Sequence, residues 1–196
     1  AIAVTLLLIQ STVAVEFQCT FDEWVGWGYG CIMTDGNIQT IDDAIVTDIH
    51  GEHKSDRDND DVAWISIDSK IIRHFPKNLT NFFPKLITIH LVKSKLRQIN
   101  ADDMVGLENL QNLYLDYNEI GLVDDDAFDG MPKLRTLAFD YNKCHSSSVH
   151  YLRTGVIKLI AEIREKCAAP VVETTEAEIE IEIEDNIDDD DDKVEE

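Results

Sequence analysis

The sequence predicts an α/β solenoid with a short parallel sheet on its concave side, irregular returns on its convex side and a covering element at each end. Three observations support this fold class: a 24-residue hydrophobic period across residues 62–144, two cysteine pairs flanking that region, and helically spaced apolar residues after it. A single repeat cannot bury its own apolar side chains, so neighbouring repeats must stack into one core. Such an architecture usually presents a surface to a partner.

The clearest repeat begins at Leu110 and reads LQNLYLDYNEI, which fits the leucine-rich repeat pattern L-x-x-L-x-L-x-x-N-x-L. Three further copies begin at Val62, Leu86 and Leu134. The returns keep the same period through Phe75, Ile99 and Val123, then Met104 and Phe128, then Phe83, Leu107 and Met131. The asparagine position, held by Asn118 and Asn142, predicts buried side chains that bond neighbouring backbone. Ser94 and Lys70 hold it in the earlier copies, which predicts looser turns there.

Residues 15–61 are predicted to form an N-terminal cap. Within it, residues 26–30 form a glycine-aromatic turn whose aromatic side chains are expected to cover the open end of the core. Apolar and polar residues alternate over residues 45–51, which predicts an edge strand paired beside the first repeat strand, residues 64–68.

Residues 145–168 are predicted to form a C-terminal capping helix. Its main segment is residues 149–166, and Val156, Ile160, Ile163 and Cys167 follow helical spacing. Gly155 is expected to break the first turn of this helix.

The four cysteines flank the repeats, with Cys19 and Cys31 before them and Cys144 and Cys167 after them. Four cysteines allow three pairings. Two local disulfides are the economical choice, because each would staple one end of the solenoid, where a terminal core needs a cap. A zinc site is the alternative, although the spacing lacks a C-x-x-C motif.

Residues 1–14 form an apolar run that ends in small residues, which predicts a partial signal peptide cut near Ala14. A hydrophobic first strand is the alternative. No later segment has the roughly 20 apolar residues of a membrane helix. The chain is therefore expected to be secreted and extracellular, where its cysteines would oxidise. The Asn78-Leu-Thr sequon is a candidate glycosylation site.

The net charge of −22 lies mostly in residues 173–196, which hold fourteen acids and one lysine and so carry −13, leaving −9 for the rest. Residues 169–196 are predicted to be an acidic disordered tail. Phosphate binding requires a basic face, so the charge argues against nucleic acid and anionic membrane surfaces as partners. It favours a protein ligand with a basic surface.

The candidate binding site follows from strand geometry, because the repeat leucines point inward and the residues between them point out onto the concave face. Cross-strand columns of outward residues are expected, one residue per repeat. Tyrosine, tryptophan and nearby carboxylates are favoured in protein-binding surfaces for basic partners. The predicted partner-binding residues are Trp64, His90, Tyr114, Asp116, Tyr117, Asp140 and Tyr141. A solvated sheet face without a ligand is the alternative.

No catalytic residue, cofactor or metal site is predicted. His50 and His53 precede a run of aspartates, but their spacing differs from H-E-x-x-H. The run beginning at Asp56 departs from a calcium loop, because Asp61 stands at the glycine position. The sequence has no G-x-S-x-G motif, and every cysteine has a plausible disulfide partner.

The chain resembles the small secreted leucine-rich repeat proteins of insects over residues 17–167. The resemblance rests on the repeats, the Cys19…Cys31 cap, the Ile49-His50-Gly51-Glu52-His53 stretch and the ending Asn142-Lys143-Cys144…Cys167. It implies a protein that binds other proteins on its concave face, in immunity, development or matrix assembly.

The first functional hypothesis is therefore a non-enzymatic recognition module whose acidic tail adds electrostatic steering. The alternative is a structural or cation-buffering protein that acts through its tail. The sequence leaves the oligomeric state open.

Overall fold

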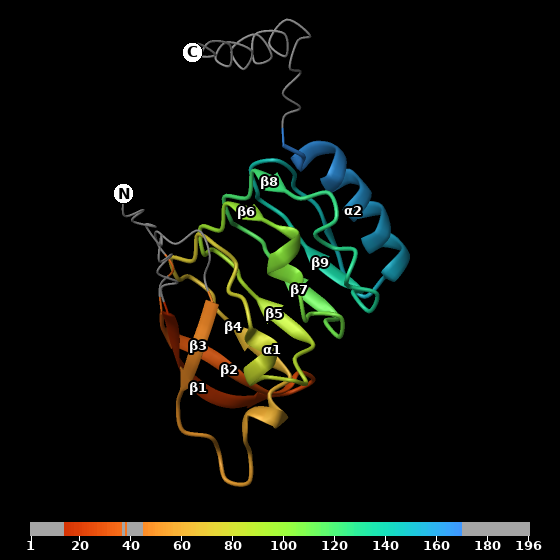
Figure 1. The fold of residues 1–196 in the computed structure, drawn as a ribbon. Helices are drawn as coiled ribbons and strands as arrows, with labels where there is room; N and C mark the ends of the chain where they lie inside the picture. The colour runs from red at the N-terminus through yellow and green to blue at the C-terminus, as the bar shows by residue number, and fades with distance from the viewer. Residues whose placement is uncertain (1–13, 37, 39–44, 170–196) are drawn as a thin grey trace, which may run out of the picture.

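The structure, a computed structural model, describes residues 14–36, 38 and 45–169, and its main feature is an eight-stranded sheet (Figure 1). The strand order is β10-β9-β7-β5-β4-β2-β1-β3. The strands are β1 (Ala14–Trp24), β2 (Gly28–Asp35), β3 (Ile45–His50), β4 (Trp64–Ser66), β5 (Thr88–His90), β7 (Asn112–Tyr114), β9 (Thr136–Ala138) and β10 (Ser148–Val149).

The repeats stack in the register that the 24-residue period predicts. Strands β4, β5, β7 and β9 pair in parallel, and Ile65, Ile89, Leu113 and Leu137 are direct partners in successive strands. All four side chains are fully buried. The prediction of a solenoid with equivalent apolar positions in one shared core is confirmed.

The returns between the strands are short and irregular. Their elements are η1 (Asn59–Asp61), α1 (Leu79–Phe82), β6 (Gln98–Ile99), η2 (Ala101–Met104) and β8 (Leu122–Val123), of which β6 and β8 form a small parallel sheet. The periodic apolar positions of the returns are buried in the same core: Phe75, Phe83, Ile99, Met104, Leu107, Val123, Phe128 and Met131.

Two asparagines, Asn118, which is buried, and Asn142, which is half-buried, join their repeats to the ones before them. Asn118 Nδ2 donates to the carbonyl oxygens of Leu91 and Leu115 at 2.6 and 3.0 Å, and Oδ1 accepts from the amides of Ser94 and Leu96. Asn142 repeats part of this pattern. In the earlier copy, Ser94 Oγ donates to the carbonyl of Ile67 at 2.8 Å, so a shorter side chain keeps this turn tied to its neighbour.

The N-terminal region differs from the predicted pairing. Strands β1 and β2 form an antiparallel hairpin, and β2 rather than β3 lies beside β4. Strand β3 pairs in parallel with β1 at the far edge of the sheet, so the expectation that residues 45–51 pair with the first repeat strand is wrong. The cause is the long apolar alternation of β1, which buries Val15, Phe17, Cys19 and Phe21 and extends the repeat core by two strands.

The C-terminal helix α2 (Arg153–Cys167) begins four residues later than predicted, because Ser148 and Val149 form β10, antiparallel to β9. Gly155 lies inside α2 and does not break it. A Cβ at Gly155 would lie 2.8 Å from Val149 Cγ1, so glycine lets α2 pack closely on β10. Figure 1 shows α2 at the end of the solenoid opposite β1–β3.

Both expected disulfides are present, Cys19–Cys31 within the β1–β2 hairpin and Cys144–Cys167 between the last repeat and α2. The predicted signal peptide, apart from Ala14, and the acidic tail, apart from Ala169, lie outside the described residues.

We expect Asn118→Ala to lower the free energy of unfolding by at least ~2 kcal/mol, because it leaves buried carbonyls and amides of two repeats without partners. Chemical denaturation under non-reducing conditions measures this loss. Asn81→Ala, at an exposed position of α1, is the matched control and should be nearly neutral. Equal losses in the two variants would contradict the role assigned to Asn118.

Candidate functional site

The outward residues of the repeat strands line up in columns on the concave face, as predicted. Trp64, Thr88, Asn112 and Thr136 form the first column, and Ser66, His90, Tyr114 and Ala138 form the second. The first column is almost completely buried, although it lies on the side of the sheet opposite the core. Other parts of the chain must therefore cover this face.

The turn of the β1–β2 hairpin supplies the first part of the cover. The Trp24 ring stacks on Trp64 with centroids 4.2 Å apart, and Trp64 Nε1 donates to the carbonyl of Gly28 at 2.8 Å. Trp64 has 0% exposure, so the expectation that it contributes to an open binding surface is wrong. Of the two aromatic residues in the turn at residues 26–30, Tyr29 is buried in the core as expected, whereas Trp27 lies over the concave face.

Trp27 continues the cover over the second column. Its ring lies 5.0 Å from His90 and 5.8 Å from Tyr114, and the His90 and Tyr114 rings stack at 4.3 Å with an interplanar angle of 6°. We call Trp24, Trp27, Trp64, His90, Tyr114 and Tyr151 the aromatic band.

Tyr151 closes the band from the C-terminal side. Its amide donates to Thr136 Oγ1 at 3.2 Å, and its hydroxyl lies close enough to that of Tyr114 to raise the pKa of Tyr114. The centre of the concave face is therefore covered from both ends of the chain.

Burial keeps the middle of the aromatic band uncharged. It lowers the pKa of His90, against the opposing effect of the Asp68 and Asp116 carboxylates. His90 Nε2 is buried, with no hydrogen-bond partner among the described residues. Burial, together with Tyr151, raises the pKa of Tyr114 to about 12. Both rings are therefore neutral near pH 7 and pack as apolar surfaces.

The outward aspartates Asp68 and Asp116 mainly connect repeats. Asp68 Oδ1 accepts from the amide of Val92, and Asp116 Oδ1 accepts from the amide of Asp140, each at 2.9 Å. Ser148 also donates to Asp116, at 3.3 Å. Burial raises the pKa of Asp116, and the hydrogen bond from the Asp140 amide opposes that shift. Asp116 thus has a structural role, and both Asp116 and Asp140 are half-buried.

The exposed part of the concave face lies along one edge, at the turns that follow β5, β7 and β9. Lys93, Tyr117 and Tyr141 stand at the same position in successive repeats, and we call them the tyrosine ladder. The two tyrosine rings stack at 4.4 Å and are 49% and 65% exposed, respectively. Large aromatic side chains this exposed, side by side and held in one orientation, are suited to contact a partner.

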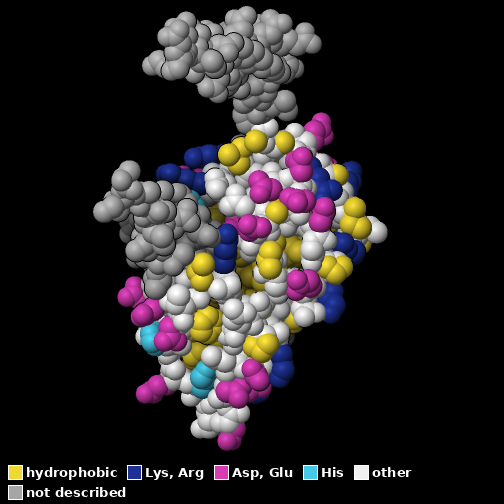
Figure 2. All heavy atoms as spheres, viewed as in Figure 1, with side chains coloured by type: hydrophobic (Ala, Val, Ile, Leu, Met, Phe, Trp, Pro, Cys, Tyr) yellow, Lys and Arg dark blue, Asp and Glu magenta, His cyan; other side chains and the backbone are white. Residues whose placement is uncertain are grey.

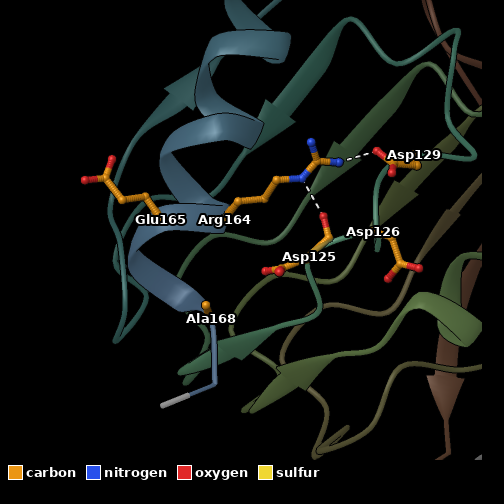
Figure 3. Close-up of a pocket in the computed structure, with 6 residues that line it drawn as sticks. All are labelled: Asp125, Asp126, Asp129, Arg164, Glu165 and Ala168. Carbon is orange, nitrogen blue, oxygen red and sulfur yellow. Dashed lines mark hydrogen bonds and ion pairs between the residues drawn. The ribbon is translucent and has the colours of Figure 1, made fainter. Parts of the chain in front are cut away.

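A second surface feature is acidic. Figure 2 shows acidic side chains gathered between β8 and α2. A shallow pocket there is lined by Asp125, Asp126, Asp129, Arg164, Glu165 and Ala168. Figure 3 shows Arg164 reaching from α2 to the Asp125 carbonyl and the Asp129 carboxylate, while the carboxylates of Asp125, Asp126 and Glu165 point away from one another. Arg164 thus links α2 to the return that contains Asp125 and Asp129.

His53, which precedes the aspartate run, also has a structural role. His53 contacts the Tyr29 hydroxyl at 3.0 Å and Asn59 Oδ1 at 2.9 Å, and the Asp58 side chain caps η1. Within the described ranges, no group of three or more His, Cys, Asp or Glu side chains is placed to hold a metal ion.

Sequence comparison places the repeat region in a known family. The leucine-rich repeat family model matches residues 61–120 and 109–152. The match covers the stacked repeats of β4, β5, β7 and β9 and supports leucine-rich repeats there. The search of curated proteins finds no match. Leucine-rich repeat arrays are typically binding scaffolds rather than enzymes and suggest a protein partner. No described helix has the length and apolar character needed to cross a membrane.

The sequence reasoning brought the correct repeat residues together but missed the aromatic band that covers them. The alternation V-E-F-Q-C-T-F over residues 15–21 signals a strand, and the short Gly26-Trp27-Gly28 turn that follows it signals a hairpin. Placing the hairpin turn on the concave face required the observed β2–β4 pairing. The leucine-rich repeat motif carries no information on that pairing.

We expect Gly30→Ala to lower the free energy of unfolding by about 2 kcal/mol, because overpacking would displace the Trp64 ring. An added Cβ would lie 2.2 Å from two Trp64 ring atoms. Denaturant unfolding monitored by tryptophan fluorescence measures the loss. Gly130→Ala, which meets no atom within 4 Å, is the control and should change stability by less than about 0.5 kcal/mol. A neutral Gly30→Ala would contradict the close packing of this strand on Trp64.

We also expect His90 to make stability depend on pH. Because burial lowers its folded-state pKa, its contribution is fully present above the unfolded value of 6.5 and is lost as the pH falls from there through the folded-state pKa. Urea unfolding at several pH values below neutrality should show a steeper loss for the wild type than for His90→Phe. His50→Gln, at an exposed position, is the control. Parallel curves for wild type and His90→Phe would disprove this assignment.

Proposed function

We propose that the chain is an extracellular, non-enzymatic recognition module that binds a protein through the open edge of its concave face. The contact surface would be Tyr117 and Tyr141, with the exposed side of Tyr151 next to the covered centre. The observation that carries the proposal is the stacked and exposed Tyr117–Tyr141 pair on a leucine-rich repeat array.

The physical chemistry of this edge supports a protein partner. Tyrosine offers a large apolar area with a polar tip, and it loses little conformational entropy on binding. The pair is already ordered by stacking, which lowers the cost of association further. The net charge of −22 favours a partner with a basic surface and would speed encounter at low salt.

The extracellular setting is part of the proposal. Two disulfides are typical of proteins from oxidising compartments. Asn78 is exposed just before α1, on the return between β4 and β5, so a glycan there would leave the concave edge free. The resemblance to small secreted insect proteins supports an extracellular role, with immune recognition as one setting.

A second candidate function is a structural or cation-buffering protein that acts through its acidic tail. The charge of −13 in residues 173–196 favours it. In that case the solenoid would serve as a stable carrier, and binding would follow the tail.

The two functions predict opposite behaviour in a capture experiment. Immobilised wild type is exposed to extracellular fluid, and retained proteins are identified and then titrated singly. We expect the Tyr117→Ala, Tyr141→Ala double variant to weaken the binding of a retained protein about tenfold or more, as for central aromatic anchors. Leu122→Ala, at an exposed position in β8, is the control and should bind like the wild type.

Deletion of residues 173–196 separates the candidates. Binding that survives this deletion and fails in the double variant supports recognition at the tyrosine ladder. Binding that survives the double variant and fails in the deletion favours the cation-buffering function.

A further inference from the structure

The Tyr141 ring ends a stack that the repeats build one residue at a time. Lys93, Tyr117 and Tyr141 share a left-handed backbone with φ of 56°, 57° and 58°. The amide of Lys93 donates to the carbonyl of Asp116, and that of Tyr117 to the carbonyl of Asp140, at 3.1 and 2.9 Å. The three side chains therefore leave the backbone in the same direction, one repeat apart. The planes of the two tyrosine rings are nearly parallel, with 13° between them.

One end of this stack already holds a cation from the chain itself. Lys93 Nζ lies 5.3 Å from the centroid of the Tyr117 ring. Tyr141, from the following repeat, stacks on Tyr117 with the two ring centroids 4.4 Å apart. After Tyr141 the chain leaves the repeat pattern and enters β10 and α2, so no repeat residue extends the stack over the part of the chain described up to Ala169. The outer face of Tyr141 is accordingly more open, at 65% exposure against 49% for Tyr117.

The charge around this end suits a second cation. Partial desolvation raises the pKa of Tyr117, and Tyr141 and the carboxylates of Asp116 and Asp140 add to the shift. The half-buried Asp140 directly precedes Tyr141, and its Oδ1 accepts from Ser146 Oγ at 3.4 Å, which is a long hydrogen bond. Lys143, the next cation along the chain, pairs with Glu119 at 3.4 Å.

We propose that the outer face of Tyr141 is the subsite for an arginine side chain of a basic protein partner, with the Asp140 carboxylate as its counter-charge. The inference rests on the proposed recognition function and specifies the chemistry of one contact. A guanidinium is planar and weakly hydrated, so it can stack on the ring while it donates to a carboxylate at the ring edge. An ammonium group gains less from that geometry.

The test uses the full-length, oxidised protein and three short peptides: acetyl-Gly-Arg-Gly-amide, its lysine counterpart and its uncharged citrulline counterpart. Titrations at about 150 mM ionic strength, which screens charges more than ~8 Å away, are followed by NMR of the tyrosine rings. We expect the arginine peptide to shift the Tyr117 and Tyr141 ring signals and to bind about two- to fivefold more tightly than the citrulline peptide. Equal affinity of all three peptides would overturn the subsite.

Variants locate the contact. Tyr141→Leu should remove the preference for arginine, while Tyr141→Phe, which keeps the ring face, should retain it. Asp140→Asn should reduce the preference of arginine over citrulline without removing a ring. Leu122→Ala changes an exposed residue of β8 outside the ladder and should leave the preference intact.

The subsite and the proposed function can fail separately. If Tyr141→Leu binds the arginine peptide like the wild type while the double tyrosine variant still loses its captured protein, the arginine subsite is wrong and recognition at the ladder stands.

Discussion

The structure depends on one constraint, the 24-residue register in which each repeat satisfies the polar groups of its neighbour. Asn118 and Asn142 bond buried carbonyls, while Asp68 and Asp116 accept amides of the following repeat. A one-residue shift in the pairing of neighbouring strands would leave these groups without hydrogen-bond partners. It would also turn the repeat leucines away from the core. The same register fixes the spacing of outward side chains, so the tyrosine ladder is a direct consequence of how the repeats are held together.

The parts of the fold that repeat could be predicted from the sequence, and the parts that occur once could not. The alignment of Ile89, Leu113 and Leu137 follows from periodicity, because any other stacking would expose them. Strand β3 and the start of α2 depend on contacts between segments distant in sequence. Val149 fits a helical pattern, but pairing with Leu137 satisfies the otherwise open edge of β9 and makes it a strand residue.

The residues of the candidate site also fall into two groups, those that periodicity predicts and those that depend on contacts with distant segments. Tyr117 and Tyr141 lie where periodicity places them, with exposed rings. Trp64 occupies the correct column, yet it is buried because Trp24 and the β2 backbone lie over it. Exposure on the concave face depends on what the rest of the chain places there, and a local repeat motif contains no such information. This packing requires glycine at position 30, because only a residue without a Cβ fits beneath the Trp64 ring.

A solenoid this short has a specific difficulty that the aromatic band addresses. Four repeats bury a small core with two open ends, so residues outside the repeats must add apolar contact area. The β1–β2 hairpin and the Tyr151 segment add it by packing on the concave face as well as on the ends. Stability thereby uses the centre of the concave surface. The exposed edge at Tyr117 and Tyr141 is the part of that face that the caps do not reach, and its rings are ordered by stacking on each other rather than by burial. For that reason a partner can contact them without displacing any residue that holds the fold together.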